Sequence, residues 1–152
     1  MSRVLIADAM SPRAAAVFRE RSVEVDERSG LSQEELIDCI GDYNGIAVRS
    51  TTFVDIPVLG AAPNLKVVGR AGIGIDNIDL PAATARGVVV MNTPFGNSIT
   101  TAEHAIAMLL SLARRIPEAD RSTRSGKWEK NRFLGVEVAN KALGLIGCGN
   151  IG

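Results

Sequence analysis

The sequence contains few of the side chains that bind metals or form disulfides. Its two cysteines, Cys39 and Cys148, do not form a Cys-x-x-Cys pair, and there is a single histidine, His104. Close cysteine spacing marks both redox motifs and cysteine-only metal sites. The sequence therefore predicts neither a redox motif nor a metal site.

The chain also lacks an excess of charge of either sign and any long apolar run. Its 17 Lys and Arg balance its 17 Asp and Glu, so nothing in the composition attracts nucleic acid or an acidic membrane at long range. No run approaches the roughly 20 apolar residues of a membrane span, and the N-terminus does not resemble a secretion signal. We expect a soluble, cytoplasmic protein that binds neither nucleic acid nor membrane.

Hydrophobic residues make up 46% of the 152 residues, enough for a packed core. Short apolar runs alternate with helix-forming stretches, which predicts an α/β fold with a parallel sheet. Ser32 and Glu35 form a capping box, and Ser11 precedes a proline at another helix start. Residues 88–91 are all apolar, as in an interior strand. The expected strands are residues 4–7, 22–25, 46–48, 65–68 and 88–91, and the expected helices are residues 12–20, 33–40, 55–60 and 81–86.

A stretch rich in structure-breaking residues then interrupts the alternation. Residues 92–97 read NTPFGN, and we place a domain boundary there, with one domain over residues 1–94 and a second over residues 95–152. This boundary precedes the longest helical pattern of the chain.

Two features stand out in the second region. Thr100 and Glu103 form a capping box, and residues 105–113 are apolar on nearly every face, so we expect a helix that is buried on several sides. Residues 121–132 are basic and predict a surface arm, with Trp128 and Phe133 as its apolar anchors.

The chain ends on a glycine motif that follows an apolar run. Residues 142–146 predict a strand, and residues 147–152 read GCGNIG, which fits G-x-G-x-x-G. In dinucleotide-binding folds such glycines allow a tight turn, the approach of a pyrophosphate and close helix packing. The pattern also occurs in ordinary turns, and the helix and acidic residue that complete the fingerprint would lie beyond Gly152. We therefore expect this chain to be the front part of a longer protein.

Several motifs in order resemble those of the NAD-dependent D-2-hydroxyacid dehydrogenases. They are VRS at residues 48–50, VVGRAGIGIDNID at residues 67–79, MNTPFGNS at residues 91–98, GKWE at residues 126–129 and GLIGCGNIG at residues 144–152. The set covers nearly the whole chain and is most similar to the members that oxidise D-3-phosphoglycerate. The resemblance implies a flavodoxin-like substrate domain with a parallel sheet, followed by the start of a Rossmann NAD-binding domain.

The resemblance also implies roles for particular residues. Arg49 and Arg70 match positions used toward the phosphate and carboxylate of the substrate, which suits guanidinium groups because they hold oxyanions through paired N–H bonds. Either arginine could instead form a surface ion pair, and Asn97 could equally be a helix cap. The implied substrate-binding residues are Arg49, Ser50, Arg70, Ala71, Gly72 and Gly74. The implied NAD-binding residues are Ile73, Asn97, Gly147, Gly149, Asn150, Ile151 and Gly152.

The implied reaction is oxidation of D-3-phosphoglycerate to 3-phosphohydroxypyruvate with NAD, which begins serine synthesis. In the family a His–Glu pair and an Arg carry the chemistry downstream of the glycine motif, so we assign no catalytic residue in this chain and expect it to be inactive alone. His104 and Glu103 are more simply read as structural. The family also dimerises through the region of the long helix, which implies a homo-oligomer.

Two departures leave the substrate open. The family often has Thr where this chain has Ile73, and often Lys where it has Phe53. One alternative is another D-2-hydroxyacid dehydrogenase, such as a glyoxylate or hydroxypyruvate reductase, which needs no phosphate contact. Another is a non-catalytic module that senses NAD, because one fold can carry unrelated functions.

Overall fold

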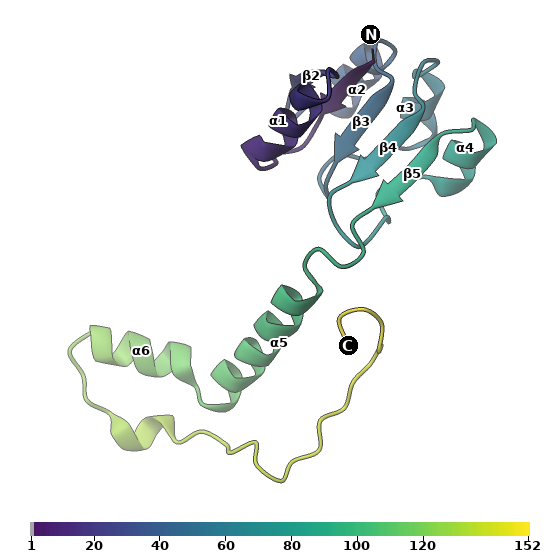
Figure 1. The fold of residues 1–152 in the computed structure, drawn as a ribbon. Helices are drawn as coiled ribbons and strands as arrows, with labels where there is room; N and C mark the ends of the chain where they lie inside the picture. The colour runs from purple at the N-terminus through teal and green to yellow at the C-terminus, as the bar shows by residue number, and fades with distance from the viewer. Residues whose placement is uncertain (1) are drawn as a thin grey trace. The chain divides into compact units, whose positions relative to one another are not determined.

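The computed structural model describes residues 2–152, which form two compact units divided between Gly96 and Asn97 (Figure 1). Each unit has its own set of internal contacts. None of the helices within residues 2–152 combines the length and apolar character needed to cross a membrane.

The first unit is an α/β domain built on a five-stranded parallel sheet, which confirms the expected fold class (Figure 1). The strand order β2-β1-β3-β4-β5 is that of flavodoxin-like folds, with the reversal of order between β1 and β3. The strands are β1 Arg3–Ile6, β2 Glu24–Glu27, β3 Gly45–Val48, β4 Val67–Arg70 and β5 Val89–Asn92. The helices are α1 Pro12–Glu20, α2 Gln33–Ile40, α3 Ile56–Gly60 and α4 Leu80–Ala85.

Short polar side chains begin each of these helices. The capping box is confirmed, since Ser32 Oγ accepts from Glu35 N at 3.2 Å and Glu35 Oε2 accepts from Ser32 N at 2.8 Å. The backbone N–H of Ser32 first, and then its hydroxyl, lower the pKa of the Glu35 carboxyl. The side chains of Ser11, Asp55 and Asp79 cap α1, α3 and α4, each by accepting one hydrogen bond from a backbone N–H of the first turn.

The main core lies on the face of the sheet covered by α2, α3 and α4. Leu36 and Ile40 of α2 pack with Val58 and Leu59 of α3 against the central strands, and Val68 of β4 is fully buried there. The opposite face is covered less completely: Val89 and Met91 of β5 are 57% and 56% exposed. The expectation of an interior strand at residues 88–91 is therefore wrong, because β5 is the edge strand of the sheet and has one open face.

Two strands lie two residues further along the chain than the apolar pattern suggested. Ser22 takes a left-handed conformation (φ 57°) in the turn after α1, so the second strand starts only at Glu24. In β4 the shift matters for function, since it makes Arg70 the last residue of a strand rather than part of a loop.

The second unit contains α5 Ser98–Ala113, α6 Ile116–Arg124 and the 3₁₀ helix η1 Lys130–Phe133. Thr100 and Glu103 do not form the expected capping box, because the helix already begins at Ser98. No residue of α5 is buried in the described structure, so the expected burial of residues 105–113 is not met within this unit. Trp128 is 84% exposed and does not anchor the basic arm.

The last segment passes the end of α5 and then has no regular structure. Val136 N donates to Ala113 O at 2.7 Å, and an added Cβ at Gly135 would lie 2.5 Å from that same oxygen, so glycine permits the close approach. The expected strand at residues 142–146 is wrong: no strand forms there in the described chain, and Ile146 is fully exposed. A lone apolar run has no neighbouring strand to satisfy its backbone groups.

The contacts of Asp26 predict that part of the stability of the first unit is lost in acid. Its carboxylate accepts from Tyr43 Oη at 2.9 Å and pairs with Arg3 at 2.7 Å, and the Tyr43 hydroxyl first, then Arg3, lower the pKa of Asp26. This stabilisation is complete above the unfolded-state pKa of about 4 and is lost as pH falls through the lower folded-state pKa. We expect Asp26→Asn to lower the urea midpoint near neutral pH, and we expect this deficit to shrink as pH falls through the folded-state pKa of Asp26. The exposed Glu24→Gln is the control, and a deficit for Asp26→Asn that persists unchanged at low pH would contradict the assignment.

Candidate functional site

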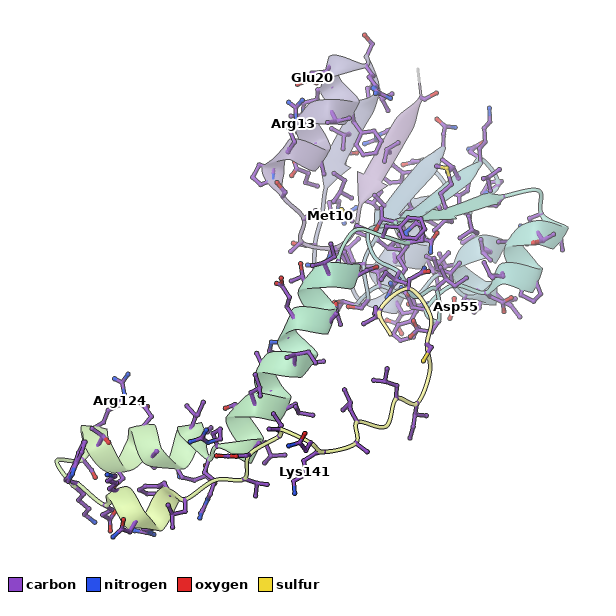
Figure 2. The ribbon with its side chains drawn as sticks, turned by 60° about the horizontal axis from the view of Figure 1, so that its bottom comes forward. Met10, Arg13, Glu20, Asp55, Arg124 and Lys141 are labelled. Atoms are coloured by element: carbon purple, nitrogen blue, oxygen red, sulfur yellow. The ribbon has the colours of Figure 1, made fainter. Side chains whose placement is uncertain are left out.

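The candidate site lies at the edge of the sheet where the parallel strands end. In folds with this strand order, ligands bind outside the carboxyl ends of the strands near the reversal point, which here lies between β1 and β3. Met10 and Asp55, labelled in Figure 2, mark the segments that follow β1 and β3. Segments following β4 and β5 complete this edge.

Arg70 is the central side chain of this edge. It is only 10% exposed, and its Nε donates to Asn77 Oδ1 at 2.9 Å. Asp76 approaches its Nη2 at 3.8 Å, but that carboxylate is 87% exposed and weakly engaged. The guanidinium is therefore held mainly by a neutral amide and keeps most of its positive charge available to a ligand.

The guanidinium of Arg70 lies directly over the glycine loop. An added Cβ at Gly72 would lie 2.6 Å from Arg70 Nη1, and one at Gly74 would lie 3.6 Å from it and 2.9 Å from Asp76 Oδ1. Neither glycine takes a left-handed backbone conformation. An added methyl group would therefore displace the guanidinium at Gly72 and the carboxylate of Asp76 at Gly74, whereas backbone conformation requires glycine at neither position.

The end of β5 orients the glycine loop. Thr93 N donates to Gly72 O at 3.0 Å, and Asn92 Nδ2 donates to Ile73 O at 2.8 Å. With these carbonyls occupied, no residue in the described chain accepts a hydrogen bond from the N–H groups of Ile73 and Gly74. A guanidinium beside free backbone N–H groups is an arrangement that binds carboxylate or phosphate oxygens.

Arg49 has a different environment from Arg70. Its backbone N donates to the buried carboxylate of Asp8 at 2.5 Å, and Asp8 also accepts from Thr52 N at 3.3 Å and Thr52 Oγ1 at 2.9 Å. The Arg49 side chain is exposed, with Nη1 3.4 Å from Ala9 O. Its backbone is thus fixed, while its guanidinium lies beside the segment after β1 rather than over the glycine loop.

The structure brings together Arg70, Ala71, Gly72 and Gly74 of the expected substrate residues, with Ala71 N bonded to Val48 O at 2.9 Å. Arg70 and Ala71 also line a cavity of about 360 Å³. Ser50 is exposed next to Arg49. The substrate roles of all these residues remain predictions.

Four polar residues of this edge had no predicted role. Each ends a strand or lies in the segment after one, so position at the carboxyl edge was the signal that could have identified them. They are Asp8, Thr52, Asn77 and Asn92.

The expected NAD-binding residues of the second unit lie at its two ends. Asn97 occupies the N-cap position of α5 but makes no side-chain capping bond. The alternative that Asn97 serves simply as a helix cap is therefore not confirmed. Gly147 has the left-handed conformation of a tight turn (φ 87°), and a Cβ added at Gly149 would meet open space. Asn150, Ile151 and Gly152 continue this irregular loop.

The potential metal ligands, the two cysteines and His104 form no further candidate site within residues 2–152. No cluster of potential metal ligands occurs among residues 2–152, and both cysteines are free thiols. His104 is exposed on α5, in agreement with a structural or solvated histidine.

Gly72→Ala tests the contact between the guanidinium and the loop. The new methyl group forces Arg70 Nη1 away, and we expect about a tenfold weaker affinity for a small carboxylate such as D-glycerate, as for loss of a charge-assisted hydrogen bond. Titration calorimetry measures it. Gly60→Ala is the matched control, since its added Cβ makes only an ordinary 3.8 Å contact; equal losses in both variants would contradict the prediction.

The chain is similar to known proteins in sequence and to solved structures in fold. D-3-phosphoglycerate dehydrogenase of Archaeoglobus fulgidus is 52% identical over 150 residues, which are 99% of this chain and 28% of that protein. Among solved structures, the TT0316 protein of Thermus thermophilus has a TM-score of 0.90 at 33% identity, covering 98% of this chain and 50% of that one. NAD⁺-bound 3-phosphoglycerate dehydrogenase of Entamoeba histolytica has a TM-score of 0.78 at 28% identity, covering 99% and 47%.

The chain thus spans a little over a quarter of the length of the curated relatives that it matches. Residues 4–146 match the family described as D-isomer specific 2-hydroxyacid dehydrogenase, catalytic domain. This match extends over the strands, the glycine loop and most of the second unit. The chain therefore belongs to the D-isomer-specific 2-hydroxyacid dehydrogenase family.

Proposed function

We propose that this chain supplies the substrate-binding part of an NAD-dependent D-3-phosphoglycerate dehydrogenase. The observation that carries the proposal is the Arg70 guanidinium, held over a glycine loop whose N–H groups at Ile73 and Gly74 are free to bind an anion. The names of the relatives, with 45–52% identity for the first two, support this substrate among the 2-hydroxy acids.

In this proposal the two arginines hold different ends of the substrate. Arg70, with the N–H groups of the glycine loop, binds the carboxylate, because paired donors beside a cation fit its two oxygens. Arg49 is exposed and directly follows the neighbouring strand β3, where its guanidinium, bonded in this structure only to Ala9 O at 3.4 Å within the described residues, can reach the phosphate. Ser50 and Ala71 flank these groups. No residue of this chain is assigned to proton transfer.

NAD would accept the hydride from the substrate when bound. The residues at the end of the chain fit its pyrophosphate, because Gly147 makes a tight turn and Gly149 leaves the backbone open to close approach. Asn97, Asn150, Ile151, Gly152 and the loop residue Ile73 are the further contacts that we assign to NAD.

We also propose that the protein is a homo-oligomer that works in the cytoplasm at the start of serine synthesis. The support for assembly is α5, whose side chains Ile106, Met108 and Leu112 are 48%, 60% and 80% exposed within their own unit. A helix with so much apolar surface is stabilised by covering it.

The roles proposed for Arg49 and Arg70 predict different losses of affinity for two ligands. We expect Arg49→Ala to weaken binding of D-3-phosphoglycerate about tenfold and to leave D-glycerate unchanged, because only the first ligand has a phosphate. We expect Arg70→Lys to weaken both ligands by similar factors, since Lys keeps the charge but loses the planar fork. Calorimetry on the protein that contains this chain measures these affinities.

Arg13→Ala is the control for charge removal. Arg13 pairs with Glu20 at 2.6 Å on the exposed face of α1, far in sequence from the glycine loop. Figure 2 labels both residues on this helix. A D-glycerate affinity as high as that of D-3-phosphoglycerate in the wild type, with no effect of Arg49→Ala, would favour a dehydrogenase for a non-phosphorylated 2-hydroxy acid.

A further inference from the structure

Asn77 connects three parts of the candidate site through one buried side chain. It is 4% exposed, and its Oδ1 accepts from Arg70 Nε at 2.9 Å. Its Nδ2 donates to Arg49 O at 2.8 Å and to Thr52 O at 2.5 Å. All hydrogen-bonding groups of this amide are therefore used, and they join the arginine at the end of β4 to the loop that follows β3.

The backbone around Asn77 fixes the position of that amide. Val54 N donates to Asn77 O at 2.9 Å, and Asp79 N donates back to Val54 O at 2.9 Å, which makes an isolated parallel bridge between Val54 and Ile78. The fully buried Val54 anchors this bridge in the core. Asn77 thus sits on rigid backbone, as a residue that positions another side chain requires.

The Arg49–Thr52 loop is held from both sides. Asp8 accepts from Arg49 N and from Thr52 N, whereas Asn77 donates to the carbonyls of the same two residues. The backbone N–H groups of Arg49 and Thr52, which could otherwise bind an external anion at the reversal point of the sheet, are thus satisfied internally by Asp8. These two N–H groups are therefore not available to a substrate anion.

We propose that Asn77 is a positioning residue for substrate binding, which sets the Arg70 guanidinium over the glycine loop and fixes it relative to the Arg49 loop. The inference rests on the proposed function and adds a residue to which no role was assigned. By holding Nε, Asn77 directs the two Nη groups toward the loop, where Gly72 leaves room for them. A pre-set guanidinium loses less freedom on binding an anion than a mobile one.

Asn44 provides a matched comparison at the other edge of the sheet. Its Oδ1 accepts from Arg3 N at 3.0 Å and its Nδ2 donates to Asn64 O at 3.4 Å, so this amide also joins separate segments of the unit. It contacts backbone groups only, whereas Asn77 holds a charged side chain. Asn44→Ala therefore removes a bridging amide of the same unit without touching the candidate site.

The first experiment is a double-mutant cycle on ligand affinity in the protein that contains this chain. We expect Asn77→Ala to weaken D-3-phosphoglycerate and D-glycerate alike, by about tenfold, because both carry the carboxylate that Arg70 binds. In an Arg70→Lys background the same substitution should cost less than about twofold, since its target is already lost. Asn44→Ala should change neither affinity in either background.

A second measurement needs no variant and so does not depend on whether Asn77→Ala folds. In ligand-free wild-type protein the Nε–H proton of Arg70 should exchange with water more slowly than that of the exposed Arg49, because only the former is bonded to Asn77. Nitrogen-15 NMR resolves the two. Equal, fast exchange at both arginines would overturn the inference.

The outcomes separate this inference from the proposed function. If the wild type binds neither ligand, the proposed function fails and the positioning role fails with it. If the wild type binds both ligands and Asn77→Ala binds them equally well, or loses the same factor in the Arg70→Lys background, only the positioning role is wrong.

Discussion

The candidate site depends on keeping one positive charge in an almost buried place. Arg70 is 10% exposed, and a cation in such a position is costly unless its N–H groups find partners. A neutral amide satisfies Nε, and the one nearby carboxylate, that of Asp76, is largely solvated. The first unit thus leaves this charge incompletely compensated. An anion that binds beside Arg70 completes the compensation of its charge, which is a physical reason for anion binding. This reason cannot be seen in any single sequence motif.

Much of the first unit follows from local sequence signals. Ser32 with Glu35 predicted the start of a helix because a capping box is satisfied within four residues, whatever surrounds it. The alternation of short apolar runs with helix-forming stretches likewise predicted the parallel sheet, because each of these signals lies within a short segment. Whether a segment is buried depends instead on partners that are distant in sequence. Residues 88–91 are as apolar as an interior strand, yet β5 is the edge strand of the sheet. Residues 142–146 are also apolar, but within the described residues no strand lies beside them.

In the candidate site, too, some residues could be identified from a short motif, whereas others are recognised only by contacts between distant parts of the chain. Arg70 and Gly72 were identifiable because they stand in one short motif, and the structure explains their pairing through the 2.6 Å approach at Gly72. The contacts of Asp8 and Asn77 join residues 41 and 28 positions apart along the chain. Such pairs become visible only once the strand order is known, since that order brings the ends of β1, β3 and β4 together.

The open face of β5 has a consequence for handling the chain. An edge strand presents unpaired backbone N–H and C=O groups, and here the side chains of Val89 and Met91 add an apolar surface beside them. Together these features form a template on which a further strand from another molecule can add. We therefore expect concentrated preparations of the 152 residues to self-associate, and we expect a charged residue in place of Val89 to reduce this association.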